Sequence, residues 1–149
     1  MFRGNSKVTL DSKGRMAIPT RFRDDIVQRC GGSLVASMDS HDPCLLLYPL
    51  PDWEGMERRL MRLSGNKRSI RRYQRRILGQ AFEMDMDGHG RILIPRELRS
   101  SAALDRQAIL IGQGSRFELW DEEHWKQWLE ASSDEDLDDL PPELESLLL

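Results

Sequence analysis

The chain carries one motif twice, as DSKGRMAIPTRFR at residues 11–23 and as DGHGRILIPRELR at residues 87–99. An Asp, a Gly, an Arg, an Ile, a Pro and a final Arg recur in register in the two copies. The paired positions are Asp11/Asp87, Gly14/Gly90, Arg15/Arg91, Ile18/Ile94, Pro19/Pro95 and Arg23/Arg99. The likeness continues through an apolar hairpin segment, at 34–48 in the first copy and 108–120 in the second. The chain is therefore predicted to contain two copies of one structural unit.

Each copy has the pattern of a strand, a tight turn, a strand, a short helix, a hairpin and a further helix. In the first copy, Asp11 can cap the turn backbone and Gly14 can adopt a positive φ, which predicts a hairpin between residues 8–10 and 15–18. Period-two alternation then places Met16 and Ile18 on one face and Arg15 on the other. The second copy alternates in the same way, so an arginine is expected to point away from the core in both.

The helix boundaries follow from proline, glycine and aspartate. Pro19 and Pro95 are expected in the first turn of the short helices, because proline supplies a fixed φ and needs no partner for a donor there. Gly31 is expected to end the first of these helices. After each hairpin segment, Asp52 and Asp121 are expected to cap the helix that follows.

The segment between the copies predicts two helical pieces. The first has an apolar stripe at helical spacing, made of Trp53, Met56, Leu60 and Leu63. The second, at residues 67–76, is a basic amphipathic helix, with apolar residues on one face (Ile70, Tyr73, Ile77, Ala81) and arginines on the opposite face (Arg68, Arg71, Arg72, Arg75, Arg76). The basic face has four interpretations: a solvated surface, a phosphate contact, a subunit contact, or a site for an acidic partner.

Composition limits the class of protein. The 149 residues include 22 Lys+Arg and 25 Asp+Glu, but residues 131–149 hold seven acids and no base, so the rest of the chain has an excess of four bases. This acidic tail is expected to be disordered, or to form a short helix on docking. Cys30 and Cys44 form no CxxC pair, which favours a reducing cytoplasm and two small core residues. The opening MFRGNSKVTL has no apolar signal region and no stretch is long enough to span a membrane, so a soluble, cytoplasmic protein is expected.

Several segments of the sequence are informative together: the two D-x-x-G-R-[hydrophobic]-x-I-P copies, the opening MFRG, the hairpin segment CLLLYPLPDW and the later FELWDEEHW. Together they resemble the MraZ family of bacterial transcriptional regulators. The resemblance covers about residues 1–130. It implies an α+β fold in which two tandem SpoVT/AbrB-type units form a swapped-hairpin β-barrel pseudo-dimer with helices packed outside, and it implies subunits that assemble into a homo-oligomeric ring.

On this basis the chain is divided into a first repeat at 1–54, a helical insert at 55–82, a second repeat at 83–130 and the acidic tail at 131–149. The resemblance also implies a repressor of the division and cell-wall gene cluster that binds short repeated sequences in double-stranded DNA upstream of the promoter. Such a protein would be associated with the nucleoid.

The motif residues themselves are compatible with DNA reading. An arginine on a two-stranded ribbon can enter the major groove and hold guanine O6 and N7 with two parallel bonds, which is the role expected of Arg15. Phosphate contacts are expected from Lys13, Arg3 and Lys7. Arg91 is expected to contribute a smaller share, since His89 stands where the first copy has Lys13. The residues expected to support the hairpins are Asp11, Gly14, Asp87 and Gly90. An alternative is that each Asp and Arg form an ion pair that only locks the turn.

Other classes of function fit the sequence less well. Asp39 with His41 and Asp87 with His89 have no paired nucleophile and no metal-ligand spacing, so neither an enzyme nor a metal or cofactor site is expected. A ring-forming structural or protein-binding scaffold is the alternative to a DNA-binding regulator. Trp125 and Trp128 could contact a neighbouring subunit, but both are expected in the core.

Overall fold

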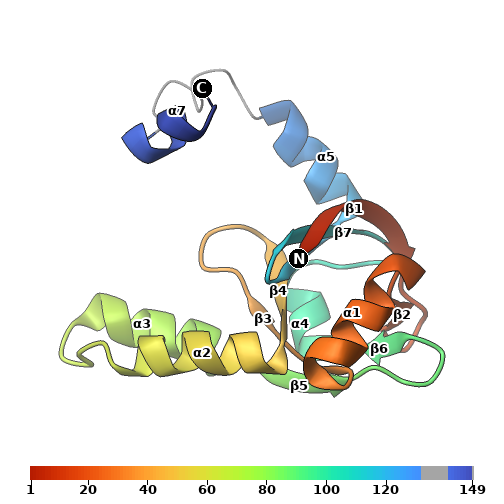
Figure 1. The fold of residues 1–149 in the computed structure, drawn as a ribbon, viewed down its shortest axis with the longest axis horizontal. Coiled ribbons are helices and arrows are strands. Elements are labelled where there is room, and N and C mark those ends of the chain that lie inside the picture. The colour runs from red at the N-terminus through yellow and green to blue at the C-terminus, as the bar shows by residue number, and fades with distance from the viewer. Residues whose placement is uncertain (132–140, 149) are drawn as a thin grey trace.

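A computed structural model describes residues 1–131 and 141–148 of the chain. The two repeats have the same succession of elements (Figure 1). The first contains β1 (Phe2–Thr9), β2 (Arg15–Ala17), α1 (Thr20–Cys30), β3 (Ser33–Met38), β4 (Cys44–Pro49) and α2 (Leu50–Met61). The second contains β5 (Phe82–Asp85), β6 (Arg91–Leu93), α4 (Arg96–Ser101), β7 (Gln107–Gly114), β8 (Phe117–Asp121) and α5 (Glu122–Ala131). Helix α3 (Arg68–Ile77) lies between the repeats in sequence, and α7 (Pro142–Leu148) follows them.

Six antiparallel strands form one sheet in the order β1-β7-β8-β4-β3-β5. The first strand of each repeat pairs with the hairpin of the other repeat: β1 lies against β7, and β5 lies against β3. The two hairpins meet in the middle of the sheet, where β4 pairs with β8. The fold is therefore a mixed α+β fold in which the two repeats exchange their first strands.

The predicted hairpin between residues 8–10 and 15–18 is wrong in its pairing. The turn itself forms, since Asp11 N donates to the Arg15 carbonyl at 2.9 Å and Gly14 N donates to the Asp11 carbonyl at 3.0 Å. Beyond it, a single bridge joins Leu10 to Met16, and β2 pairs instead with β6 of the other repeat in a separate two-stranded sheet. Alternation in sequence determines which face a side chain occupies but does not identify the partner strand.

Alternate residues of the central strands supply two hydrophobic cores. Leu45 and Leu47 of β4 face the main core, which draws residues from both repeats. Leu46 and Tyr48 of the same strand face a second core under the helical insert, together with Trp53 of α2. Since helices cover the second face, every residue of β4 is buried. The predicted alternation in β2 is confirmed as well, because Met16 is 1% exposed and belongs to the main core.

The helix ends agree in part with the predictions. Gly31 ends α1 in the left-handed region at φ 64°, and Asp121 Oδ2 accepts a bond from His124 N at the start of α5. Pro19 and Pro95 lie one residue before the helices, at the N-cap rather than in the first turn. Asp52 is not a cap, because α2 begins two residues earlier, at Leu50, where a proline at the next position favours an earlier start.

Peripheral residues differ more from the predictions. Leu63 lies beyond the end of α2 and is 51% exposed, so it does not extend the stripe, whereas Met56 packs on the second core. Trp128 is 44% exposed and is not a core residue; it stacks on Trp125 over the buried Trp120.

The two cysteines and the tail complete the comparison with the sequence. Cys44 is buried, and burial raises the pKa of its thiol, while Cys30 is partly buried against the main core.

Residues 142–148 of the tail form α7, and the predicted disorder of residues 132–140 falls outside the described residues. Within residues 1–131 and 141–148, no helix is long and apolar enough to cross a membrane.

A reciprocal contact between the turns joins the two repeats. Ile18 N donates to the Gly90 carbonyl at 2.8 Å, and Ile94 N donates to the Gly14 carbonyl at 2.9 Å. The Arg23 side chain lies against Gly90, and the Arg99 side chain lies against Gly14, so closely that a Cβ atom on either glycine would overlap the guanidinium group. The turn of each repeat thus packs against an arginine from the helix of the other repeat.

We predict that Gly90→Ala destabilises the fold. Gly90 has φ 74°, and a side chain in this left-handed region costs about 1–2 kcal/mol before any contact is considered. The new methyl group would also displace the Arg23 guanidinium, so the loss of unfolding free energy in urea should exceed that backbone cost.

Gly88→Ala in the same turn is the matched control. A Cβ on Gly88 meets nothing within 4 Å and the residue has no positive φ, so this variant should stay within about 0.5 kcal/mol of the parent. Equal destabilisation by the two changes would show that the contact with Arg23 does not contribute.

Candidate nucleic-acid interface

The motif arginines of both repeats meet on one short ribbon. In the pairing of β2 with β6, Arg15 lies opposite Leu93 and Arg91 lies opposite Ala17. The two arginines are therefore diagonal neighbours on the same face, at Cα atoms about 7–8 Å apart. The opposite face carries Met16 and Ile92, which are both 1% exposed. The buried pair fixes the ribbon to the core and leaves the arginine face outward.

Each arginine is held by the aspartate of its own turn. Arg15 Nε donates to Asp11 Oδ2 at 3.0 Å, and Arg91 Nε donates to Asp87 Oδ2 at 3.1 Å. The other carboxylate oxygen of each aspartate accepts two backbone N–H groups, from Lys13 and Arg15 in the first turn and at the matching positions in the second. Each aspartate thus binds the backbone of its own turn as well as the arginine.

The ion pairs do not bury the arginines. The side chains of Arg15 and Arg91 are 41% and 42% exposed. Only Nε of each guanidinium is engaged by its aspartate, and within residues 1–131 and 141–148 the terminal nitrogens of Arg15 have no hydrogen-bond partner. The ion pair and an outward, available arginine are therefore compatible, although they were alternatives in the sequence.

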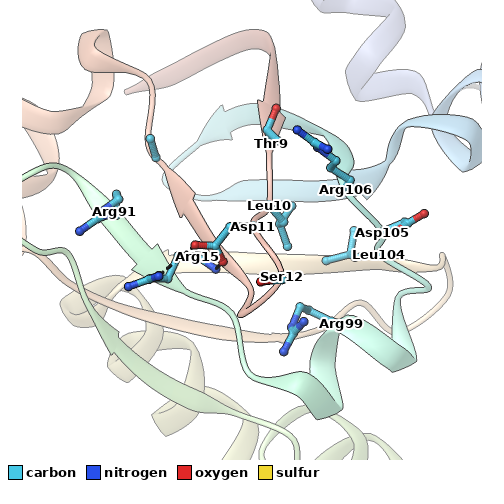
Figure 2. Close-up of a pocket in the computed structure, with 11 residues that line it drawn as sticks. Thr9, Leu10, Asp11, Ser12, Arg15, Arg91, Arg99, Leu104, Asp105 and Arg106 are labelled. Atoms are coloured by element: carbon cyan, nitrogen blue, oxygen red, sulfur yellow. Dashed lines mark hydrogen bonds and ion pairs between the residues drawn. The ribbon is translucent and has the colours of Figure 1, made fainter.

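A cleft of about 700 Å³ lies beside the ribbon. Figure 2 shows Arg15 next to Asp11 on one wall, with Arg99 of α4 and Arg106, just before β7, on the others. Four arginines (Arg15, Arg91, Arg99, Arg106) and two aspartates (Asp11, Asp105) line it, which gives an excess of positive charge. An arginine-lined concave surface of this kind attracts phosphates.

The other predicted contact residues are spread along the first repeat. Lys13 is exposed at the tip of the first turn, as is His89 at the second. Lys7 lies on the exposed face of β1, where Nζ is 3.7 Å from Glu122 Oε1. Arg3 is at the other end of β1, about 20 Å from Thr9 at the rise of a strand. Lys13 thus adjoins the ribbon. The charge of Lys7 is partly offset by Glu122, and Arg3 lies at the far end of β1.

Two positioning residues, Arg23 and Arg99, were not identified as such from the sequence. Arg23 Nε donates to the Ile18 carbonyl at 2.7 Å and Arg99 Nε donates to the Ile94 carbonyl at 3.1 Å, while both side chains lie against the turn glycines of the other repeat. The sequence does contain a signal for this role, because an arginine ends both copies of the motif. Arg106 had no such signal, because it comes to the cleft through the exchanged pairing of β1 with β7.

Within the described residues, no group of three or more His, Cys, Asp and Glu residues could hold a metal ion. The Asp87 carboxylate is occupied by the turn backbone and by Arg91, and the Asp39 carboxylate is occupied by the backbone N–H groups of His41 and Asp42. Both Asp/His pairs noted in the sequence therefore have structural roles in turns.

We predict that the first turn loses stability in acid. Bonds from the Arg15 backbone N–H, from the Arg15 side chain and from the Lys13 N–H hold the pKa of Asp11 below its ordinary value of 3.8. A lowered pKa in the folded state means that the stabilisation is complete above about pH 4 and is lost as the pH falls through the folded-state value. The difference in urea midpoint between the parent and Asp11→Asn should therefore be constant from pH 5 to 8 and should shrink below pH 4.

Asp87→Asn provides a second, equivalent measurement. The pKa of Asp87 is lowered by the corresponding bonds, first of all from the Arg91 backbone N–H, so the same pH dependence is expected. A midpoint difference that stays constant down to pH 2 in both variants would contradict the ionic origin of the turn stability.

Comparison with known proteins identifies the family. The family model of the MraZ protein, an antitoxin-like family, matches the chain twice, at residues 1–76 and 77–144. Relatives named transcriptional regulator MraZ come from Methylococcus capsulatus (48% identity, 99% of both chains), Pseudomonas aeruginosa strain LESB58 (46%, all of both chains) and Yersinia pestis strain Pestoides F (50%, 90% of this chain and 88% of the relative). These relatives are regulators and not enzymes. The chain, with its two exchanged repeats, belongs to the MraZ family.

Proposed function

We propose that the chain is a sequence-specific DNA-binding transcriptional regulator whose β2–β6 ribbon enters the major groove. One observation carries the proposal: Arg15 and Arg91 share the exposed face of a single ribbon, and each is oriented by an aspartate. The major groove, about 12 Å wide, accepts a two-stranded ribbon. The names of the relatives, all transcriptional regulators, support this class of function.

Base reading in this proposal uses the part of each arginine that the aspartate leaves open. The terminal nitrogens of Arg15 can donate two parallel bonds to guanine O6 and N7. Because Asp11 already fixes Nε, less side-chain freedom is lost on binding. Diagonal neighbours of this kind have Cα atoms about 7–8 Å apart, which corresponds to about two base-pair steps of roughly 3.4 Å.

Phosphate contacts complete the proposed interface. We assign them to Lys13 at the tip of the first turn and, farther along β1, to Lys7 and Arg3. The end of the ribbon near Arg91 carries His89 in place of Lys13 and is less positive. We therefore assign the larger share of DNA binding to the first repeat.

A single ribbon touches only a few base pairs, so useful affinity requires several subunits. We propose a homo-oligomeric ring that engages several short promoter repeats at once, since linked sites can raise affinity by about 10²–10⁴. Each subunit would be a barrel-like pseudo-dimer of the repeats at 1–54 and 83–130, with the insert at 55–82 outside it. The proposed role is repression of the division and cell-wall gene cluster, in the cytoplasm at the nucleoid.

Two substitutions at Arg15 test base reading. Arg15→Ala should weaken binding to the repeats by about 1–3 kcal/mol per subunit contact, and the preference over random duplex should fall accordingly. Arg15→Lys keeps the charge but not the two parallel bonds, so it should lose the preference while the dependence of log K on log salt stays near that of the parent. Footprinting on DNA upstream of the protein's own gene, with salt titration, measures both.

The same footprinting also distinguishes a DNA-binding regulator from a ring-forming protein scaffold. Both variants should keep subunit assembly and should melt close to the parent, since Arg15 is partly exposed, its ion pair with Asp11 lies at the surface, where such pairs contribute little, and the buried face of the ribbon is unchanged. If Arg15→Ala protects the repeats as well as the parent does, Arg15 is not a reader. If the parent has no preference for any upstream sequence at any salt concentration, a ring-forming protein scaffold becomes the better interpretation.

A further inference from the structure

Helix α3 presents a second basic surface. Its five arginines (Arg68, Arg71, Arg72, Arg75, Arg76) are all exposed. None of them forms an ion pair within residues 1–131 and 141–148, whereas Arg15 and Arg91 on the ribbon are both paired with aspartates. Arginines three or four positions apart on one helix repel each other. This surface is therefore uncompensated within the described part of the subunit and would gain from a polyanion.

The helix is held firmly to the body at its carboxyl end. Ser37 Oγ donates to the Ile77 carbonyl at 2.6 Å, and Ile77 packs on the second core. Arg76 Nε donates to the Asp39 carbonyl at 3.2 Å, and Gln74 Nε2 donates to the Leu60 carbonyl at 3.3 Å on α2. The arginine face is consequently presented in one orientation, which reduces the entropy lost when a ligand binds.

A concave region of about 600 Å³ adjoins the arginines. It lies between α3 and the loop from β3 to β4, and its lining includes Arg72, Arg75 and Arg76. The loop contributes Ser40 and His41, and the hydroxyl of Tyr73 lies 3.5 Å from His41 Nε2. Hydroxyl groups beside guanidinium groups suit the non-bridging oxygens of a phosphate backbone.

The chemistry of the face favours phosphates over a protein partner. The centres of protein interfaces are rich in apolar and aromatic groups and carry Arg but few other charges, whereas the exposed residues of α3 are five arginines with Ser69 and Tyr73 and include no aliphatic side chain. All five cations are arginine, which binds phosphate through paired bonds, and none is lysine.

The position of α3 separates it from the ribbon. Figure 1 shows the α2 and α3 pair at one end of the longest axis of the molecule, with β2 and β6 at the opposite end. The ribbon and α3 are therefore two separate surfaces of the chain, and a duplex that the ribbon holds crosswise to this axis does not reach α3. A phosphate backbone bound at α3 then belongs to another segment of DNA.

We propose that α3 binds the phosphate backbone of duplex DNA without regard to base sequence, on a segment other than the one held by the ribbon of the same chain. The proposal rests on the DNA binding proposed above. It gives the protein the capacity to hold two DNA segments together.

The test compares two triple variants of the full chain. Arg71→Gln/Arg72→Gln/Arg75→Gln alters α3 and leaves Arg76, which is bonded to Asp39, in place. Arg58→Gln/Arg59→Gln/Arg62→Gln, also at exposed positions, makes the same change of charge at α2. Gln has nearly the helix propensity of Arg, so both helices should persist, and thermal melting verifies this. Should the α3 triple variant fail to fold, Arg72→Gln alone replaces it.

The assay immobilises a duplex with the upstream repeats, saturates it with protein and then titrates a labelled duplex without repeats at several salt concentrations. The parent should retain the second duplex. The slope of log K against log salt for this duplex should fall in magnitude by about 2–3 for the α3 triple variant, or by about 0.9 for Arg72→Gln, as expected for lost phosphate contacts. The α2 variant should match the parent, and all variants should bind the immobilised repeats equally.

Three results would overturn the proposal: no retention of the second duplex by the parent, equal retention by the α3 variant, or an equal loss with the α2 variant. If a synthetic peptide of residues 131–149 binds the parent but not the α3 variant while the second duplex is not retained, α3 is a site for an acidic segment instead. Failure of the proposed function gives a different result, because the parent protein would then bind the upstream repeats no better than a duplex without repeats. The effect of the α3 change on binding to the duplex without repeats would still decide the question of α3.

Discussion

The structure depends on an exchange between the two repeats at their turns. Gly14 has no side chain, and the Arg99 guanidinium lies in the space this leaves; Gly90 and Arg23 repeat the arrangement. Ile18 and Ile94, directly after β2 and β6, donate their N–H groups to the turns of the other repeat, while their carbonyls accept bonds from the arginines of their own repeat. A repeat on its own would leave the isoleucine N–H group without a partner, which is costly. Each repeat thus supplies what the other needs.

The geometry of the arginine surface follows from this exchange. Because the turns are held by the opposite repeats, β2 and β6 come together and bring both motif arginines onto one face. The aspartate in each turn then has two functions in one carboxylate. One oxygen closes the turn through backbone N–H groups, and the other binds Nε of the arginine. Turn stability and arginine orientation therefore depend on the same carboxylate, in both repeats.

Much of this could be predicted from the sequence, since its signals are local. The repeat, the turn glycine, the end of α1 at Gly31 and the outward direction of Arg15 all follow from spacing and residue type. The pairing of β1 with β7 could not be predicted, because alternation fixes the face of a strand and not its neighbour. For the same reason Arg99 and Arg106 were not placed beside Arg15, although the recurrence of Arg23 and Arg99 indicated a shared role. The exposure of Trp128 is likewise a tertiary property, because it depends on how α5 packs on β8.

The net charge of −3 does not argue against a polyanion as partner, because the charge is unevenly distributed. Seven acids lie in residues 131–149, whereas residues 58–76 carry nine bases and no acid. Charges attract a duplex only within about a Debye length, close to 8 Å at physiological salt, so the field near a surface depends on the groups at that surface and not on the total. At the ribbon, Arg15 and Arg91 are each paired with an aspartate, and specificity can come from geometry. At α3 no ion pair within the described residues offsets the arginines, so the attraction there is stronger but carries no information about bases. The two surfaces are thus suited to different parts of DNA binding.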